Sequence, residues 1–348
     1  MRLRPRHEGF ILPTVLVTIS VVTLIFLVAM TALASLTREA AEARARVRFL
    51  QDAMTFEARL ALLGATERLG PTGLLIGAPL PPGEFQALSP EEDAAFRAGM
   101  AAARDLRFDG RPYRIGDSAA VRIRDQAGLI NISRLTGVEM DRLMSRLGAS
   151  SSEASAISAA LVDYLDPDAI PTLNGAEASD YPAGTGGPAY RPLRSPDEFL
   201  NVLGVRAAID RGSWRALRPV LTADHLAFRG NINTASSDAL QIVFGLTDRQ
   251  AQAAISARER APFYTLDEVV TATGAAIRTD VEIAPVYASG RSIYTVEDFR
   301  SRWTYTGRLV LTPSHPERPF WIDLTELGQA QDPITDLEDA PEFPSAPG

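Results

Sequence analysis

The sequence predicts an α+β fold in which one long N-terminal transmembrane helix packs on an antiparallel sheet that carries a large, mainly helical insertion. Three observations lead to this expectation. An uncharged run extends from Phe10 to Thr37, and apolar residues at helical spacing continue beyond it. A mostly helical block follows from about Thr136 to Thr273. Segments with the alternation of strands lie before and after that block, so strands from both sides can share one sheet.

The N-terminal run is long enough to span a bilayer, which needs about 20 apolar residues. Arg2, Arg4 and Arg6 precede it, and because positive residues stay in the cytoplasm, the remainder of the chain should face the other side. No proline or glycine interrupts the chain between Val15 and Leu63. We therefore expect one helix, half of it in lipid and half of it amphipathic.

Composition excludes several kinds of site. The 348-residue chain has no cysteine, which excludes disulfides, zinc–thiolate sites and cysteine nucleophiles. Its three histidines are scattered, which argues against a histidine metal cluster or a histidine-based triad. A net charge of −8 argues against a protein whose main role is to bind nucleic acid through phosphates. No motif of an enzyme active site stands out, and we expect no enzymatic activity.

A short basic leader that ends in Gly9, followed by Phe10 and the long helix, resembles the signal of type IV pilins and type II secretion pseudopilins. The resemblance implies that a prepilin peptidase cleaves after Gly9 and methylates the new N-terminal amine of Phe10. The alternative is a plain signal anchor with an incidental glycine. Most family members carry a glutamate where this chain has Thr14, and its omission resembles the minor pseudopilin K family of type II secretion.

An acidic loop follows the first part of the helical block. Oxygen ligands on an irregular loop suit calcium, which takes 6–8 of them, although the spacing is not that of an EF-hand. The alternative is a solvated acidic loop in which Asp163 or Asp166 caps a helix. The loop also resembles the aspartate-rich segment in which pseudopilin K proteins bind calcium, and the resemblance implies a structural Ca²⁺. The expected ligands are Asp163, Asp166, Asp168, Glu177 and Asp180.

A second motif, from Gly230 to Val270, resembles the helix-hairpin-helix unit of DNA-uptake proteins, with a weaker copy that begins at Gly128. Asn233 or Thr234 is expected to cap its first helix. In a DNA-binding hairpin, glycines let backbone amides approach a phosphate. Here the turn has a single glycine and an aspartate that would repel a phosphate. We therefore expect a structural module for protein packing and no nucleic-acid partner.

These segments divide the chain into six parts. The last part is rich in acidic residues and proline, a composition typical of disorder. In order, we expect a prepilin leader (1–9), the transmembrane part of the helix (10–37), the first part of a pilin-like α+β domain (38–130), an inserted helical domain like SAM and helix-hairpin-helix domains (131–275), the second part of the pilin-like sheet (276–330) and a disordered tail (331–348).

The resemblance implies a minor pseudopilin of the type II secretion system that caps the tip of the pseudopilus and helps to start its assembly. Its expected partners are the minor pseudopilins I, J and H, together with the prepilin peptidase. It would lie in the inner membrane as a single-pass protein with a cytoplasmic N-terminus and most of the chain in the periplasm. The alternative function is a membrane-tethered, pilin-like DNA-binding or DNA-uptake protein that uses the helix-hairpin-helix motif.

Processing of the leader gives a first test. Mass spectrometry of the protein extracted from membranes should show a mature chain that begins at a methylated Phe10. A Gly9→Ala variant should keep the unprocessed leader, because the peptidase of this family cleaves after glycine. A wild-type chain that still begins at Met1 would leave the plain signal anchor as the correct interpretation.

Overall fold

The structure is a computed structural model of the chain. It describes residues 11–79, 89–135, 137–184, 186–227, 230–277, 286–299, 301–313, 315, 317–330, 337 and 339–344. The chain divides into two compact units, Met1–Thr55 and Phe56–Gly348. Gly9 and Phe10, the expected processing site, lie outside the described residues.

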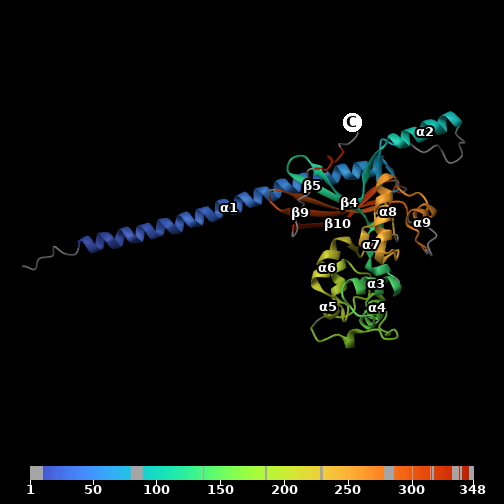
Figure 1. Ribbon diagram of the computed structural model, residues 1–348. Coiled ribbons are helices and arrows are strands. Elements are labelled where there is room, and N and C mark those ends of the chain that lie inside the picture. The colour runs from blue at the N-terminus through green and yellow to red at the C-terminus, as the bar shows by residue number, and fades with distance from the viewer. Residues whose placement is uncertain are drawn as a thin grey trace, which may run out of the picture. The chain divides into compact units, whose positions relative to one another are not determined.

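A single helix, α1, runs from Ile11 to Thr66 (Figure 1). The predicted long helix is thus confirmed, and it extends a few residues further at each end. Its apolar side chains between Leu12 and Leu36 are exposed, and the helix is long and apolar enough to cross a membrane. The second compact unit begins inside this helix, at Phe56.

The last three turns of α1 belong to the second unit and pack on its sheet. Phe56 is buried, and its ring centroid lies 5.5 Å from that of Tyr294 in edge-to-face geometry. Glu57 accepts hydrogen bonds from the hydroxyls of Tyr294 and Tyr305. At Gly64 a Cβ atom would lie 2.6 Å from Leu311, so glycine permits the close approach of helix and sheet.

The main sheet has five antiparallel strands in the order β10-β9-β8-β5-β4. Its central pair, β5 and β8, flanks the helical insertion in sequence, and the two strands pair directly from Ala119–Asp298 to Asp125–Ser292. This confirms that strands on both sides of the insertion share one sheet. The strands are β4 (Asp109–Ile115), β5 (Ala119–Asp125), β8 (Arg291–Asp298), β9 (Trp303–Leu311) and β10 (Phe320–Gln329).

A smaller antiparallel sheet follows α1 and carries helix α2 between its last two strands. Its elements are β1 (Arg68–Leu69), β2 (Gly73–Ile76), α2 (Pro90–Ala102) and β3 (Arg104–Arg107).

The insertion is mainly helical and also contains a short parallel pair, β6 with β7, that the sequence did not predict. Each of these strands has only two residues, too few to show an alternating pattern. The longer helices are α3 (Gly137–Arg146), α4 (Ser151–Leu165), α6 (Arg211–Leu217), α7 (Ser237–Ile242), α8 (Asp248–Arg260) and α9 (Leu266–Thr273). The shorter elements are η1 (Gln126–Gly128), β6 (Ile130–Asn131), η2 (Ile132–Arg134), η3 (Ala178–Asp180), η4 (Pro196–Asn201), α5 (Val205–Ala208), η5 (Arg218–Val220) and β7 (Leu221–Thr222).

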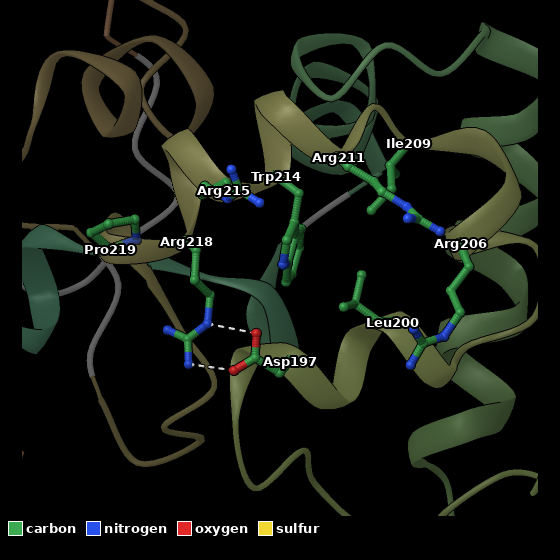
Figure 2. Close-up of a pocket in the computed structure, with 9 residues that line it drawn as sticks. All are labelled: Asp197, Leu200, Arg206, Ile209, Arg211, Trp214, Arg215, Arg218 and Pro219. Carbon is green, nitrogen blue, oxygen red and sulfur yellow. Dashed lines mark hydrogen bonds and ion pairs between the residues drawn. The ribbon is translucent and has the colours of Figure 1, made fainter. Parts of the chain in front are cut away.

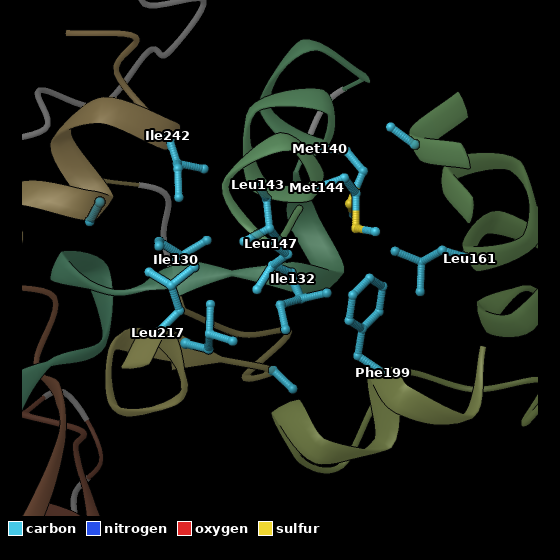
Figure 3. Packing of buried hydrophobic residues seen from close by; sticks show 14 of the residues in the cluster. Ile130, Ile132, Met140, Leu143, Met144, Leu147, Leu161, Phe199, Leu217 and Ile242 are labelled. Atoms are coloured by element: carbon cyan, nitrogen blue, oxygen red, sulfur yellow. The ribbon is translucent and has the colours of Figure 1, made fainter. Parts of the chain in front are cut away.

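One apolar core holds the insertion together. Figure 3 shows side chains from α3, α4, η4 and α7 pointing toward one another around Ile132 and Leu143, both of which are fully buried. Burial of such a side chain contributes about 1.5–3 kcal/mol relative to leaving it in water. The insertion and the sheet form one compact unit.

Asp125, the last residue of β5, joins the sheet to the insertion. Its buried carboxylate accepts hydrogen bonds from the backbone N–H of Ala127, from the N–H and hydroxyl of Ser289, from Asn231 Nδ2 and from the hydroxyl of Thr234, over 2.6–3.1 Å. Burial raises the pKa of Asp125, and the bonds from Ser289 and Asn231 oppose that shift by stabilising the ionised form.

Part of the C-terminal segment is folded. Phe343 is 4% exposed, and its ring centroid lies 4.8 Å from that of Phe56. Two backbone bonds of 2.8 Å, Arg114 N–H to Pro341 and Phe343 N–H to Arg114, attach the segment to β4. The expectation of a disordered tail over 331–348 is therefore wrong for residues 339–344. Average composition predicted disorder, whereas a single aromatic residue and a free strand edge suffice to anchor the chain.

The contacts of Asp125 predict that even a conservative substitution of this residue will greatly lower the stability of the fold. In Asp125→Asn an amide N–H₂ replaces one carboxylate oxygen and faces donors, so the free energy of unfolding should fall by about 3 kcal/mol. The midpoint of urea denaturation measures this change. Asp117→Asn is the matched control, because Asp117 is 95% exposed at a turn and its loss should change the midpoint little. Equal midpoints for the two variants would contradict a joining role for Asp125.

Candidate functional site

The acidic loop begins in the last turn of α4. The Asp163 carboxylate is fully buried there and accepts two hydrogen bonds from the backbone N–H of Thr172, at 3.0 and 3.2 Å. A Cβ atom on Gly175 would lie 1.8 Å from Asp163 Oδ2. The loop therefore folds back over Asp163, and only glycine permits this approach.

A second buried carboxylate, Glu177, lies further along the loop. Its Oε2 accepts a 2.9 Å hydrogen bond from the Tyr190 hydroxyl, whereas its Oε1 is buried without a hydrogen-bond partner in the described part of the chain. Asp180 Oδ2 accepts a 2.9 Å bond from the Glu177 N–H. Burial raises the pKa of Tyr181, and the nearby charges of Asp163, Glu177 and Asp180 add to the shift. These three carboxylates thus lie around one tyrosine.

Asp166 and Asp168 are used differently. Asp166 Oδ1 accepts a 3.0 Å bond from the Asp168 N–H, and Asp168 Oδ1 accepts a 2.8 Å bond from the Ile170 N–H. Such contacts are those of Asx turns, in which a side chain shapes its own backbone. Asp168 is exposed, so these two aspartates shape the outer part of the loop.

The five expected calcium ligands are therefore not gathered at one point. Across the described residues, no three His, Cys, Asp or Glu side chains are grouped closely enough to hold a metal ion. Two features of the loop nevertheless fit a hard cation. Its donors are oxygens only, and a buried, unpartnered carboxylate oxygen such as Glu177 Oε1 requires a polar partner.

The predicted hairpin is present as α7 and α8, but its first helix is capped by another residue. The Ser236 hydroxyl accepts the bond from the Ala239 N–H at 3.1 Å, so the expectation that Asn233 or Thr234 caps this helix is wrong. Asn233 bonds instead to the Phe263 backbone N–H and C=O, and Thr234 donates to Asp125. Both residues hold distant segments together, which local sequence does not reveal.

The turn between α7 and α8 is covered by α3. Gly245 has φ +68°, and a Cβ atom there would lie 2.7 Å from Arg142 Nη2. Arg142 Nη1 also donates to the Ile242 carbonyl at 3.2 Å, near the end of α7. The next helix starts at Asp248, whose carboxylate would repel a phosphate. The hairpin is therefore built into the core of the insertion, as a packing module would be.

The first half of the insertion contains the weaker copy of the hairpin and the acidic loop. Residues 127–224 match the family model described as type II secretion system (T2SS), protein K. The chain is similar to type II secretion system protein K over this segment. The resemblance inferred from the leader, Thr14 and the acidic loop is thus confirmed, by a match that includes the acidic loop and lies outside the leader and Thr14.

One curated protein and one solved structure show how far this similarity extends. Type II secretion system protein K of Pseudomonas aeruginosa is 29% identical over 170 residues, which cover 45% of this chain and 50% of that protein. The chain thus matches about half the length of this curated relative. A chain in the crystal structure of the GspK–GspI–GspJ complex from the enterotoxigenic Escherichia coli type 2 secretion system matches with a TM-score of 0.51 and 17% identity. The match covers 83% of this chain and 99% of that one, and it shows the same α+β fold.

Sequence reasoning missed a cluster of arginines in the protein K segment. A stretch of 13 residues contains four arginines, although the chain as a whole is acidic: Arg206, Arg211, Arg215 and Arg218. This local excess of positive charge is the sequence signal that could have revealed the cluster. Only the structure shows that all four line one cavity.

Proposed function

We propose that the chain is a minor pseudopilin that caps the tip of a type II secretion pseudopilus. The observation that carries the proposal is the fold match to a protein K chain over nearly its whole length. That chain was solved in a complex with GspI and GspJ. By analogy, pseudopilins I, J and H are the partners with which this chain starts assembly. The proposed work is assembly and needs no catalytic group.

The N-terminal helix supports a membrane-stored subunit. No charged residue occurs from Ile11 to Thr37, so this part of α1 can lie in hydrocarbon without the cost of a buried charge. In this proposal a prepilin peptidase cuts after Gly9, the mature chain stays in the inner membrane, and the second unit is periplasmic. Thr14 suits a terminal position, because a tip subunit has no subunit above it whose amine a carboxylate would pair with.

The position and size of the insertion also support a cap. It leaves the sheet at Asp125 and returns at Ser289, so its bulk is attached to the middle strands β5 and β8. Such a mass on the sheet would obstruct a subunit stacked above it. The covered hairpin turn and Asp248 give no support to the alternative of a DNA-uptake protein.

A structural calcium ion is a further part of the proposal. The residues that would hold it are Asp163, Glu177 and Asp180, once the loop brings their carboxylates closer together than they lie in the described structure, with Asp166 and Asp168 shaping the loop around them. When bound, the ion would neutralise these carboxylates and satisfy the buried Oε1 of Glu177. The three residues would then fasten the loop to the end of α4.

Co-expression tests the proposed role in assembly. The full chain, extracted in mild detergent, should co-purify with pseudopilins I and J as one ternary complex in size-exclusion chromatography. Gel shift with duplex DNA at physiological salt should show no binding by the same preparation. Failure to form the complex, together with a clear DNA shift, would favour the membrane-tethered DNA-binding alternative.

Calcium binding can be tested by its effect on the melting temperature of the protein. Addition of a calcium chelator should lower the melting temperature, because a ligand at 100 times its Kd stabilises the folded state by about 2.7 kcal/mol. Glu177→Gln should abolish most of this response. Asp168→Asn is the matched control and should keep it, because Asp168 bonds to its own backbone turn. If the chelator leaves the wild-type melting curve unchanged, the loop is a solvated acidic segment that binds no calcium.

A further inference from the structure

A cavity of about 650 Å³ opens in the insertion among η4, α5, α6 and η5 (Figure 2). Its volume falls within the range of about 300–1,000 Å³ that is usual for ligand sites. It lies outside the acidic loop and the hairpin. Its lining residues are Asp197, Leu200, Arg206, Ile209, Arg211, Trp214, Arg215, Arg218 and Pro219.

The lining carries a large excess of positive charge. Four arginines face one carboxylate, a balance of +3 in a chain whose net charge is −8. Asp197 neutralises only Arg218, through two parallel hydrogen bonds of 2.8 and 2.6 Å. Arg211 and Arg215 are exposed and make no hydrogen bond or ion pair within the part of the chain that the structure describes. Two guanidinium groups are therefore available to an anionic ligand.

The neighbouring acidic residues already have other partners. Asp210 caps α6 by accepting a 2.7 Å hydrogen bond from the Ser213 N–H. Glu198 is held by Arg191, with Nη2 to Oε1 at 2.7 Å, and by the Arg194 N–H. These contacts hold both carboxylates in place, so the positive balance of the lining persists.

An apolar surface lies beside the arginines. Trp214 stacks on the buried Phe199, with ring centroids 6.2 Å apart and planes inclined by 26°. Figure 2 shows the indole projecting into the middle of the cavity, with Leu200 facing it from η4 and Ile209 near Arg211. Trp214 is half-buried. The cavity thus offers one apolar contact flanked by groups that bind anions.

This combination selects among anionic ligands. The planar guanidinium fork matches a carboxylate with two parallel bonds, and tryptophan and arginine are both enriched at the hot spots of protein–protein interfaces. Nucleic acid presents a continuous row of phosphates that would extend beyond the four arginines onto a chain with net charge −8, whereas a short acidic segment can stay within the cavity. A membrane surface is flat, whereas the apolar contact lies inside a cavity.

We propose that this arginine cavity binds an acidic, extended segment of a partner protein. Carboxylates of the segment pair with Arg211 and Arg215, and one apolar side chain between them packs on Trp214. This binding goes beyond the proposed role in the pseudopilus and does not depend on it.

The test uses the full chain in a non-ionic detergent and the peptide acetyl-Glu-Asp-Leu-Glu-Asp-amide. Calorimetry should show saturable binding that weakens with salt, because exposed charges are screened. The NMR signal of the Trp214 indole N–H, assigned with Trp214→Phe, should shift on titration. The double variant Arg211→Gln/Arg215→Gln should weaken binding by about tenfold or more.

The matched control is Arg249→Gln/Arg260→Gln. These two arginines are exposed on α8 and do not line the cavity, so the change in charge is the same and the affinity should stay that of the wild type. An unchanged melting temperature in both double variants shows that the fold is intact.

Several results would overturn the proposal. They are the absence of peptide binding, an equal loss in the control variant, and equal binding of the uncharged peptide acetyl-Gln-Asn-Leu-Gln-Asn-amide. Inorganic phosphate that shifts the Trp214 signal where the peptide does not would make the cavity a site for small anions. Binding to phosphatidylglycerol nanodiscs, lost in Arg211→Gln/Arg215→Gln, without peptide binding would make it a lipid site.

Discussion

The second unit depends on one buried carboxylate. Asp125 ends β5, starts the first turn of the insertion, and receives donors from the segments before α7 and before β8. A buried ionisable group is costly unless it is fully hydrogen-bonded, and five donors meet that condition here. The strands β5 and β8 are neighbours in space, but in sequence the whole insertion lies between them. Specific contacts must therefore hold together the points where the chain leaves the sheet and returns to it. The two bonds from Ser289 do so, and the bonds from Asn231 and Thr234 attach the middle of the insertion to the same carboxylate.

Charged contacts continue this attachment away from Asp125. The buried Asp224 of the insertion accepts a 2.7 Å bond from Arg291 of β8 and lies 3.5 Å from Arg308 of β9. On the other side, Glu259 of α8 pairs with Arg107 at 3.0 Å. Exposed ion pairs contribute little, whereas pairs as enclosed as Asp224 with Arg291 are strongly destabilising when one partner is removed. The insertion is thus fixed on the sheet by charged contacts as well as by Asp125.

Within the second unit, several sequence features have roles in the structure that differ from those their sequence suggests. The hairpin resembles a DNA-binding element, but Arg142 covers its turn, and Asn233 bonds to the Phe263 backbone inside the core. The acidic loop is split between buried carboxylates near Tyr181 and outer aspartates that form turns. The arginines of α5 and α6 instead line a cavity with Trp214 at its centre. The proposed roles in assembly, calcium binding and partner recognition therefore fall on separate parts of the chain.

The sequence by itself determined the long helix, the interruption of the sheet by a helical block and the likeness to protein K. Those features depend on local properties, namely unbroken helical periodicity, strand alternation and short motifs, which a chain carries without reference to its fold. Tertiary structure decided which side chains meet. Ser236 became the cap because Asn233 and Thr234 bond to distant segments, and Phe343 anchors a segment whose composition predicted disorder because Phe56 and β4 lie beside it. The arginine cavity has the same origin, since its residues converge only when η4, α5 and α6 pack around Phe199 and Trp214.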